Sequence, residues 1–458
     1  MNELRRFLML LWIEIRRCQA GWAALVVFAV PAIMRLQDDG PEGVVLWNEI
    51  TRSVTSAHFF MSPFAAGIAV WVVGRSRRRR TQEQETSLSS TSIVGALTPS
   101  IAVMLWMMAA YIAYFIYCAV PAWRFATWGG PTYPMIVAGG LAIIFCVAVG
   151  SIIGWFGRSA LLAPLTMLSV YGGMWYLSDA MNNPRFPELV PLRFFDNLSY
   201  GVDVRLPQGY MLWFCVWLIA AATVLLCAAL LLRSRTIGRS FVLTMTVVAA
   251  IVSGNQVLAG SNWANQFELI AVTPVCETVS VTQVCLHPAY ESLLDDAVVA
   301  IGKVVPDFEG LPGLPKTINQ IEILSATERN LPALYIYDQR TINMAVAMYY
   351  FQIVGGLESS RGFNPPNATQ CVIAAAMTAE LQAAVCLQGD VTEITAVTIS
   401  TEDSNSMANE HDSMTKWAAK MQPKYNSFMA LSPEAQRAWL VANWAELRAG
   451  SLTLEDLP

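Results

Sequence analysis

The sequence predicts an all-α polytopic membrane domain followed by a soluble α+β domain. The chain is 55% hydrophobic and 14% charged, against about 25% charged in typical soluble domains. Residues 1–258 hold 19 Arg and 12 Asp plus Glu, net +7, whereas residues 259–458 hold 10 Lys plus Arg and 22 Asp plus Glu, net −12. Because such an asymmetry indicates two environments, we expect a transmembrane domain over 1–258 and an outer domain over 259–458.

Seven apolar stretches predict about seven transmembrane helices, since a helix needs about 20 mostly apolar residues to cross a bilayer. The last stretch fades into Gly254, Asn255 and Gln256, so whether it crosses is left open. The seven stretches are 19–36, 56–74, 99–120, 133–156, 159–178, 209–232 and 240–258.

Arginine residues divide between the two sides of this predicted bundle. One side holds Arg5, Arg6, Arg16, Arg17, Arg75, Arg77, Arg78, Arg79, Arg80, Arg158, Arg233, Arg235 and Arg239, and the other holds Arg35, Arg52, Arg124, Arg185, Arg193 and Arg205. Cytoplasmic loops carry the excess of positive charge, which predicts a plasma-membrane protein with a cytoplasmic N-terminus. With seven spans the C-terminal domain is extracellular; if 240–258 does not cross, that domain is cytoplasmic.

The N-terminus predicts an interfacial helix. Arg5, Arg6, Arg16 and Arg17 bracket the apolar run 8–15, and no small-residue cleavage site follows, unlike a cleaved signal peptide. This pattern favours an amphipathic helix lying on the inner membrane surface. The alternative is that the segment extends the first span.

The outer domain is expected to mix strands and helices. Apolar and β-branched runs predict a hairpin of two strands, and recurring apolar residues predict several helices. Ser432-Pro433-Glu434 is typical of a helix start. The expected strands are 267–274, 278–284, 319–324 and 333–337, and the expected helices are 288–304, 341–354, 369–387 and one after Ser432.

Four of the nine cysteines lie in the outer domain, where disulfides persist. Cys276 and Cys285 flank the expected hairpin, which predicts a disulfide between them. Cys371 and Cys386 would lie about 22 Å apart in one continuous helix, too far for the Cα separation of at most about 7 Å that a disulfide needs. Either that helix is broken or these two cysteines do not pair with each other.

Catalytic signals are poor, which predicts that the chain is not an enzyme. The three histidines form no His-Glu-x-x-His site, so we expect no metal, and no Gly-x-Ser-x-Gly elbow occurs. The segment 310–317 is not a phosphate-binding loop, because Pro315 stands where a second glycine must expose its N–H. The acidic outer domain has no basic patch, which disfavours nucleic acid as a partner.

The interiors of the expected spans hold essentially no ionisable residue. Such residues usually mark ion paths, so their absence disfavours a proton- or sodium-coupled carrier. Aromatic and methionine side chains could instead line a path for an apolar or amphipathic substrate, with Trp106, Met107, Met174 and Trp175 as candidates. The alternative for each of them is lipid contact or packing.

One segment between spans, residues 74–94, is long, basic and polar. It is either a positive-inside anchor or a docking helix for a cytoplasmic protein. The candidate docking residues are Arg77, Arg78, Arg79, Arg80, Thr81, Glu83 and Glu85.

The order of parts resembles type-2 ABC transporter permeases, including actinobacterial ones with a C-terminal extension. These have an N-terminal surface helix and a basic loop after the second span, of the form Gly-x-x-Arg-Arg-x-Thr-x-Glu-Leu-Leu. Gly74 and the docking residues match it loosely, and Thr86-Ser87-Leu88 replaces the leucine pair. The seventh span and the large outer domain also depart from the usual six-span pattern.

The resemblance implies the transmembrane subunit of an ATP-driven transporter. It implies a homodimer, or a heterodimer with a sister permease, on separate ATP-binding subunits that hold ATP and Mg, with no cofactor in this chain. It further implies an exporter of an apolar, amphipathic or peptide-like substrate. The alternative function is a membrane-anchored receptor or sensor whose outer domain binds a ligand or partner. A membrane-embedded hydrolase is disfavoured by the missing motifs.

Overall fold

The computed structural model of the chain divides into two compact units. The first contains the chain up to Ile270, apart from the short segment 41–44, and the second contains the residues from Ala271 onward. The structure describes residues 2–37, 44–79, 93–181, 202, 204–205, 208–233, 237–259, 268–308, 311–312, 316–320, 334–336, 339, 342–354, 372–373 and 423–458.

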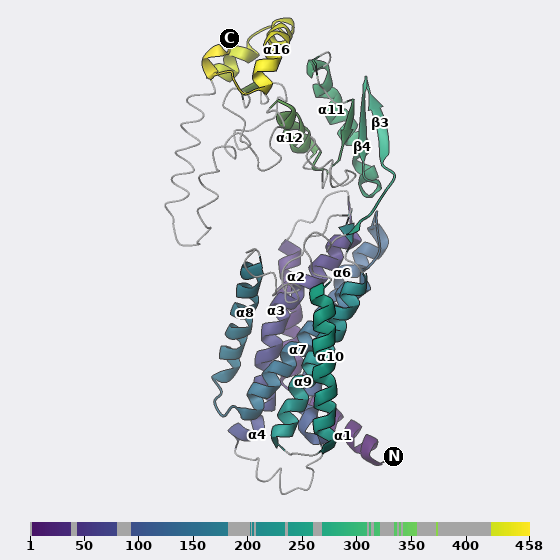
Figure 1. Cartoon of the computed structure of the whole chain (residues 1–458), viewed down its shortest axis with the longest axis vertical. Helices are drawn as coiled ribbons and strands as arrows, with labels where there is room; N and C mark the ends of the chain where they lie inside the picture. Colours follow the sequence, from purple (N-terminus) through teal and green to yellow (C-terminus); the bar gives the residue numbers. More distant parts are fainter. Residues whose placement is uncertain are drawn as a thin grey trace. The chain divides into compact units, whose positions relative to one another are not determined.

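The first unit is a bundle of long helices (Figure 1). Its helices are α1 (Asn2–Arg17), α2 (Ala20–Gln37), α3 (Trp47–Val73), α4 (Arg75–Arg78), α6 (Ile93–Phe125), α7 (Tyr133–Phe156), α8 (Leu162–Met181), α9 (Gln208–Arg233) and α10 (Ile237–Ala259). Two short strands, β1 (Val204–Arg205) and β2 (Glu268–Leu269), pair antiparallel. Each of the seven apolar stretches expected to be helical lies in one of these helices, apart from at most three residues at its ends.

The helices α3 and α7 make the most extensive contact of the bundle. A Cβ atom added at Gly150 would lie 2.1 Å from the Ala66 carbonyl oxygen, and one added at Gly154 would lie 3.0 Å from the Val70 carbonyl oxygen. Small residues let two helix backbones approach closely, which is how helices gain packing energy in a lipid medium. Glycine is therefore required at Gly150 by the neighbouring backbone.

The bundle is compatible with a multi-pass membrane protein. Among the described residues, four helices are long and apolar enough to cross a membrane, at Trp47–Val73, Leu97–Phe125, Tyr133–Phe156 and Gly209–Ala228. Helices α1 and α2 are bent by 61° and would make a fifth as a pair. In α10 the apolar stretch is shorter, Val242–Val257. The span count that length and apolarity support is thus four to five.

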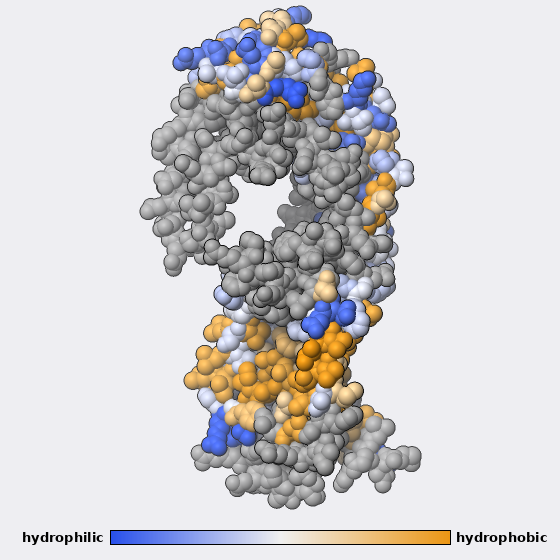
Figure 2. Space-filling model, viewed as in Figure 1, coloured by the Kyte–Doolittle hydropathy of each residue, from blue (hydrophilic) through white to orange (hydrophobic). Residues whose placement is uncertain are grey.

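Large apolar side chains cover much of the outer surface of the bundle, as the orange areas of Figure 2 show. Trp22 of α2 is 79% exposed, and Leu168 of α8 is 68% exposed. Soluble proteins rarely expose contiguous apolar patches of this kind, which mark membrane or partner contact. The exposed apolar belt and the apolar helices therefore point to the same lipid surroundings.

The second unit begins with a three-stranded sheet in the order β3-β4-β5. Strands β3 (Val275–Val279) and β4 (Thr282–Leu286) form an antiparallel hairpin, and β5 (Thr317–Asn319) pairs parallel to β4. This unit also contains the 3₁₀ helix η3 (Pro288–Leu293), the helices α11 (Leu294–Phe308), α12 (Ile342–Val354) and α16 (Pro433–Arg448), and the 3₁₀ helix η7 (Leu454–Asp456).

The hairpin forms, but its strands differ from the expected ones. Val275–Val279 is the first strand, whereas 267–274 contributes only the two residues of β2. The run 278–284 is not one strand, because Ser280, with φ 55°, turns the chain between β3 and β4. A positive φ at a two-residue hairpin loop normally selects Gly, Asn or Asp, so the sequence carried no recognisable turn signal here.

The disulfide between Cys276 and Cys285 is confirmed. The two residues are directly opposite in the hairpin register, with Cα atoms 4.1 Å apart. Cys371 and Cys386 lie outside the described residues, as does most of the expected helix 369–387.

The predicted start of the final helix is confirmed. The Ser432 side chain accepts a hydrogen bond from the Ala435 N–H, at 3.3 Å, which satisfies one of the free N–H groups of the first turn of α16. Leu440, Trp444 and Leu447 are buried along one face. The helix ends just before Gly450, which has φ 68°.

Candidate functional site

Arginine residues gather at one end of the helix bundle, the lower end in Figure 1, where α1 and α4 lie. Helix α3 ends there at Val73 and α7 ends there at Phe156, so that Arg75, Arg77 and Arg158 follow within a few residues. The end of α2, the start of α3 and the end of α6 lie at the opposite end, with Arg35, Arg52 and Arg124. We call the first the arginine-rich end.

Three polar contacts bind the N-terminal helix α1 and the residues just after it to this end. The Arg75 guanidinium lies 2.7 Å from a Glu14 carboxylate oxygen, forming an ion pair. The Trp106 indole N–H of α6 donates to the Ile15 carbonyl at 3.2 Å. Beside the break between α1 and α2, the Trp71 indole N–H of α3 donates to the Gln19 side chain at 2.7 Å. These contacts join residues 52 to 91 positions apart.

Two further arginines of the basic segment hold it against the ends of α3 and α7. The Arg77 guanidinium donates to the Phe156 carbonyl at 3.1 Å. The Arg78 guanidinium donates to the Val70 and Trp71 carbonyls, and it stacks 4.4 Å from the centre of the Trp71 ring. Carbonyl groups at a helix C-terminus carry partial negative charge, so these contacts are favourable. The basic segment is thus part of the bundle as far as Arg78.

The next residue, Arg79, differs from these three because its side chain is exposed. Its backbone continues the short helix by donating from the Arg79 N–H to the Arg75 carbonyl at 3.0 Å. Burial, together with the positive charges of Arg79 and Arg75, lowers the pKa of the Arg78 guanidinium. Within the described part of the segment, Arg79 is the arginine best placed to meet another molecule.

Helix α1 presents an exposed apolar stripe with an arginine near each end. Leu8, Met9 and Trp12 are each more than half exposed, and Arg5 and Arg16 are exposed on either side of them. The Arg16 guanidinium lies 4.4 Å from the centre of the Trp12 ring. Such a stripe fits a helix lying in the membrane interface. It forms a separate helix and does not continue α2 in a straight line.

The candidate path residues Trp106, Met107, Met174 and Trp175 lie in different surroundings. Met107 is fully buried in a cluster of α2, α3, α6 and α7 side chains, and Met174 is buried in a second cluster with α7, α9 and α10. Trp106 is bound to α1, and Trp175 is 62% exposed. The structure does not bring these four side chains together in one cavity.

Some predicted docking residues cannot be placed. Arg80, Thr81, Glu83 and Glu85 lie outside the described residues, and so does the side chain of Arg6. Arg17 is exposed at the end of α1. Sequence reasoning missed Glu14 as a partner of Arg75, and the only available signal was that Glu14 is a lone acid between basic residues.

Comparisons with known proteins leave the family open. No family model, no curated protein and no solved structure matches this chain. Membership in the type-2 ABC permease family therefore stays a prediction from the sequence features quoted above.

Proposed function

We propose that this chain is the transmembrane subunit of an ATP-driven ABC transporter, an exporter energised by a separate ATP-binding subunit. The observation that carries the proposal is the Glu14–Arg75 ion pair, which joins the interfacial helix α1 to the basic segment after α3. A displacement of α1 or of the basic segment is then transmitted to the other of the two. Through the hydrogen bonds of Trp106 and Trp71 it also reaches α6 and α3. Such a connection is what a coupling surface for a motor subunit requires.

The arginine-rich end supports a cytoplasmic position for this surface. The excess of arginine at one end of the bundle follows the positive-inside rule. In this proposal α1 lies on the inner membrane surface and seven helices cross the bilayer, which makes the second unit extracellular. The Cys276–Cys285 disulfide agrees with that assignment, since disulfides persist outside the cytoplasm.

The exposed guanidinium of Arg79 is proposed to contact the ATP-binding subunit, together with the docking residues beyond it. Arg75, Arg77 and Arg78 have a different role, because their guanidinium groups are already engaged with the bundle. ATP and Mg are bound by the partner, and two permease subunits form the pathway. The residues Trp106, Met107, Met174 and Trp175 are kept as candidates for contact with an apolar, amphipathic or peptide-like substrate.

Copurification tests the transporter proposal directly. A tagged chain from its native host, solubilised in mild detergent, should bring down an ATP-binding subunit. Arg79→Glu should weaken that association, whereas Arg124→Glu, an exposed arginine at the opposite end, should leave it unchanged. If no ATPase copurifies and the operon encodes none, the transporter proposal is abandoned in favour of the receptor or sensor.

A charge swap tests the coupling role of the ion pair. Glu14→Arg and Arg75→Glu should each lower substrate-stimulated ATPase activity by up to about fivefold, the effect of a partly exposed ion pair worth up to about 1 kcal/mol. The double variant should recover most of the activity, because it restores the pair with the charges exchanged. Equal activity in all four proteins would contradict the coupling role.

A further inference from the structure

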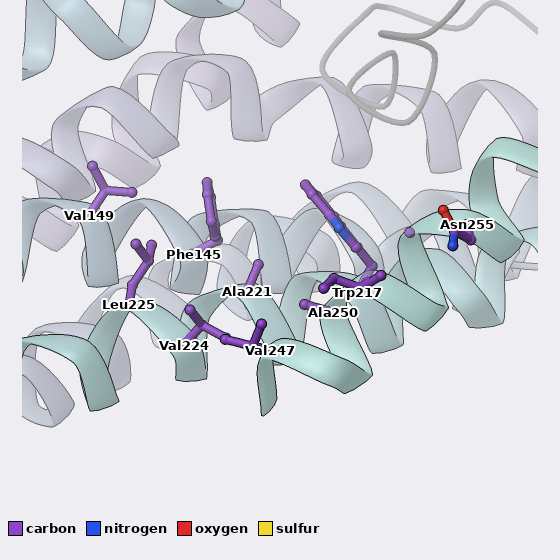
Figure 3. Close-up of a pocket in the computed structure, with 11 residues that line it drawn as sticks. Phe145, Val149, Trp217, Ala221, Val224, Leu225, Val247, Ala250 and Asn255 are labelled. Carbon is purple, nitrogen blue, oxygen red and sulfur yellow. The ribbon is translucent and has the colours of Figure 1, made fainter. Parts of the chain in front are cut away.

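A groove runs along the outside of the bundle between α7, α9 and α10. It encloses about 600 Å³ and is open on one side. Figure 3 shows Phe145 and Val149 of α7, Trp217 and Leu225 of α9, and Ala250 of α10 along it. The described helices that form it include two of the four long apolar ones.

The groove is apolar along most of its length and polar at one end. Its lining is apolar apart from the Asn255 carboxamide and the Trp217 indole N–H, which lie in the same half of the groove, with Asn255 at its end (Figure 3). Asn255 is close to the end of α10 at Ala259, opposite the arginine-rich end. The Asn255 amide can both donate and accept a hydrogen bond. It lies near the end of the apolar stretch of α10, Val242–Val257.

Aromatic rings form the wall next to this polar end. Phe214 and Trp217 stack with ring centres 6.0 Å apart, and Phe145 lies 6.4 Å from Trp217. Gly254 allows this arrangement, because a Cβ atom there would lie 3.3 Å from the Trp217 indole nitrogen. The absence of a side chain at Gly254 thus leaves room for the Trp217 ring in this wall.

The shape and the chemistry of the groove favour one kind of occupant. From Trp217 to Leu225 the apolar part extends about 12 Å along α9 at 1.5 Å per residue, and the groove continues to the Asn255 amide. A ligand with a long apolar chain and a polar group at one end matches this order. No water is available at bilayer depth to fill an open apolar groove.

We propose that this groove binds a hydrocarbon chain of a membrane phospholipid, with the ester end of that chain at Asn255. The proposal needs only that α7 and α9 cross the bilayer, and it does not depend on ATP-driven transport. It also gives α10 a role, since α10 supplies one wall and the polar end.

Photolabelling of the unsubstituted full chain gives the first test. The protein is placed in nanodiscs containing a phosphatidylcholine with a diazirine in one acyl chain, irradiated and digested for mass spectrometry. Labels should concentrate on Phe145, Trp217 and Ile251 over the highly exposed Trp22 of α2, which samples ordinary surrounding lipid. Labelling spread evenly over all exposed apolar residues would overturn the proposal.

Two matched variants give the second test. Ala250→Trp fills the groove, whereas Val248→Trp adds the same side chain at an exposed position of α10 outside it. Ala250→Trp should reduce labelling of Phe145 and Trp217 roughly tenfold, as expected when two or more methylene groups lose their contacts; Val248→Trp should not. Unchanged labelling in Ala250→Trp would refute the site. If Ala250→Trp aggregates in size-exclusion chromatography, the labelling pattern of the unsubstituted chain decides.

A second copy of the chain is the competing occupant. Ile251→Cys, in a chain where the five free cysteines that the structure describes and also Cys371 and Cys386 are replaced by serine or alanine, should form no disulfide-linked dimer under oxidation in native membranes. An oxidised dimer formed through position 251 would assign the groove to a protein interface and overturn the lipid site.

Discussion

The two units of this chain hold their helices and strands together by different means. In the bundle, α3 and α7 meet backbone to backbone at Gly150 and Gly154, and the contact depends on missing side chains. In the second unit, the hairpin is joined by the Cys276–Cys285 disulfide, and the buried amide of Gln320 connects separate segments.

This difference follows from the surroundings of each unit. Lipid is as apolar as the helix surfaces, so helices gain little by burying apolar area and depend on close fit and on satisfied polar groups. In water, burial of apolar side chains drives folding, and polar groups that become buried need hydrogen-bond partners. Four substitutions sharpen this comparison, from the largest expected effect to the smallest.

Gly150→Leu should have the largest effect. Its side chain would enter the space of the Ala66 carbonyl, so α3 and α7 must separate, with a loss of about 3 kcal/mol or more as in severe overpacking. Thermal unfolding in detergent, followed by fluorescence size-exclusion chromatography, measures it. Gly172→Leu on α8 is the control, because nothing lies within 4 Å of a Cβ atom there. Equal melting temperatures for the two variants would show that the α3–α7 contact is not tight.

Loss of the disulfide should come next. Replacing Cys276 and Cys285 by serine opens a loop with a sequence separation of 9, which should lower the stability of the second unit by about 2.5 kcal/mol. Calorimetry should show a lower melting temperature for that unit and an unchanged one for the bundle. With Cys371 and Cys386 replaced by serine in both proteins, a reducing agent should bring the chain that keeps Cys276 and Cys285 to the same value without affecting the variant that lacks them. A response of the double variant to the reducing agent would contradict this assignment.

Gln320→Ala should destabilise the second unit by about 2 kcal/mol, since two buried backbone groups lose a hydrogen-bond partner. The Gln320 side chain accepts from the His287 N–H at 2.8 Å and donates to the Ile336 carbonyl at 2.9 Å. Denaturant unfolding measures the change. Gln339→Ala removes an exposed amide that donates to Asp296, and it should cost much less. If Gln339→Ala lowered the free energy of unfolding as much as Gln320→Ala, burial of the amide would not be what makes its loss destabilising.

Ser432→Ala should have the smallest effect, about 1 kcal/mol, which is typical for the loss of a helix cap. The Ala435 N–H would lose its hydrogen bond to the serine hydroxyl. Ser432→Asp keeps an acceptor at the cap and should retain stability in the same unfolding experiment. If Ser432→Asp is as unstable as Ser432→Ala, the cap is not what stabilises the start of α16.

Features that depend on residues close together in the sequence could be predicted well. The seven helical stretches follow from runs of apolar residues, and the start of α16 follows from Ser432-Pro433. The hairpin disulfide followed from the spacing of Cys276 and Cys285. The strand limits could not be predicted, because Ser280 adopts a positive φ that its residue type rarely selects.

The sequence by itself determined the division into an apolar helical part and an acidic mixed part, because composition and periodicity act over short stretches of chain. Only the tertiary structure decided that Glu14 pairs with Arg75, 61 positions away, and that Arg79 is exposed while Arg77 and Arg78 bind the bundle. It also decided that α7, α9 and α10 leave a groove ending at Asn255. These features depend on distances between segments that lie far apart along the chain, which no local pattern encodes.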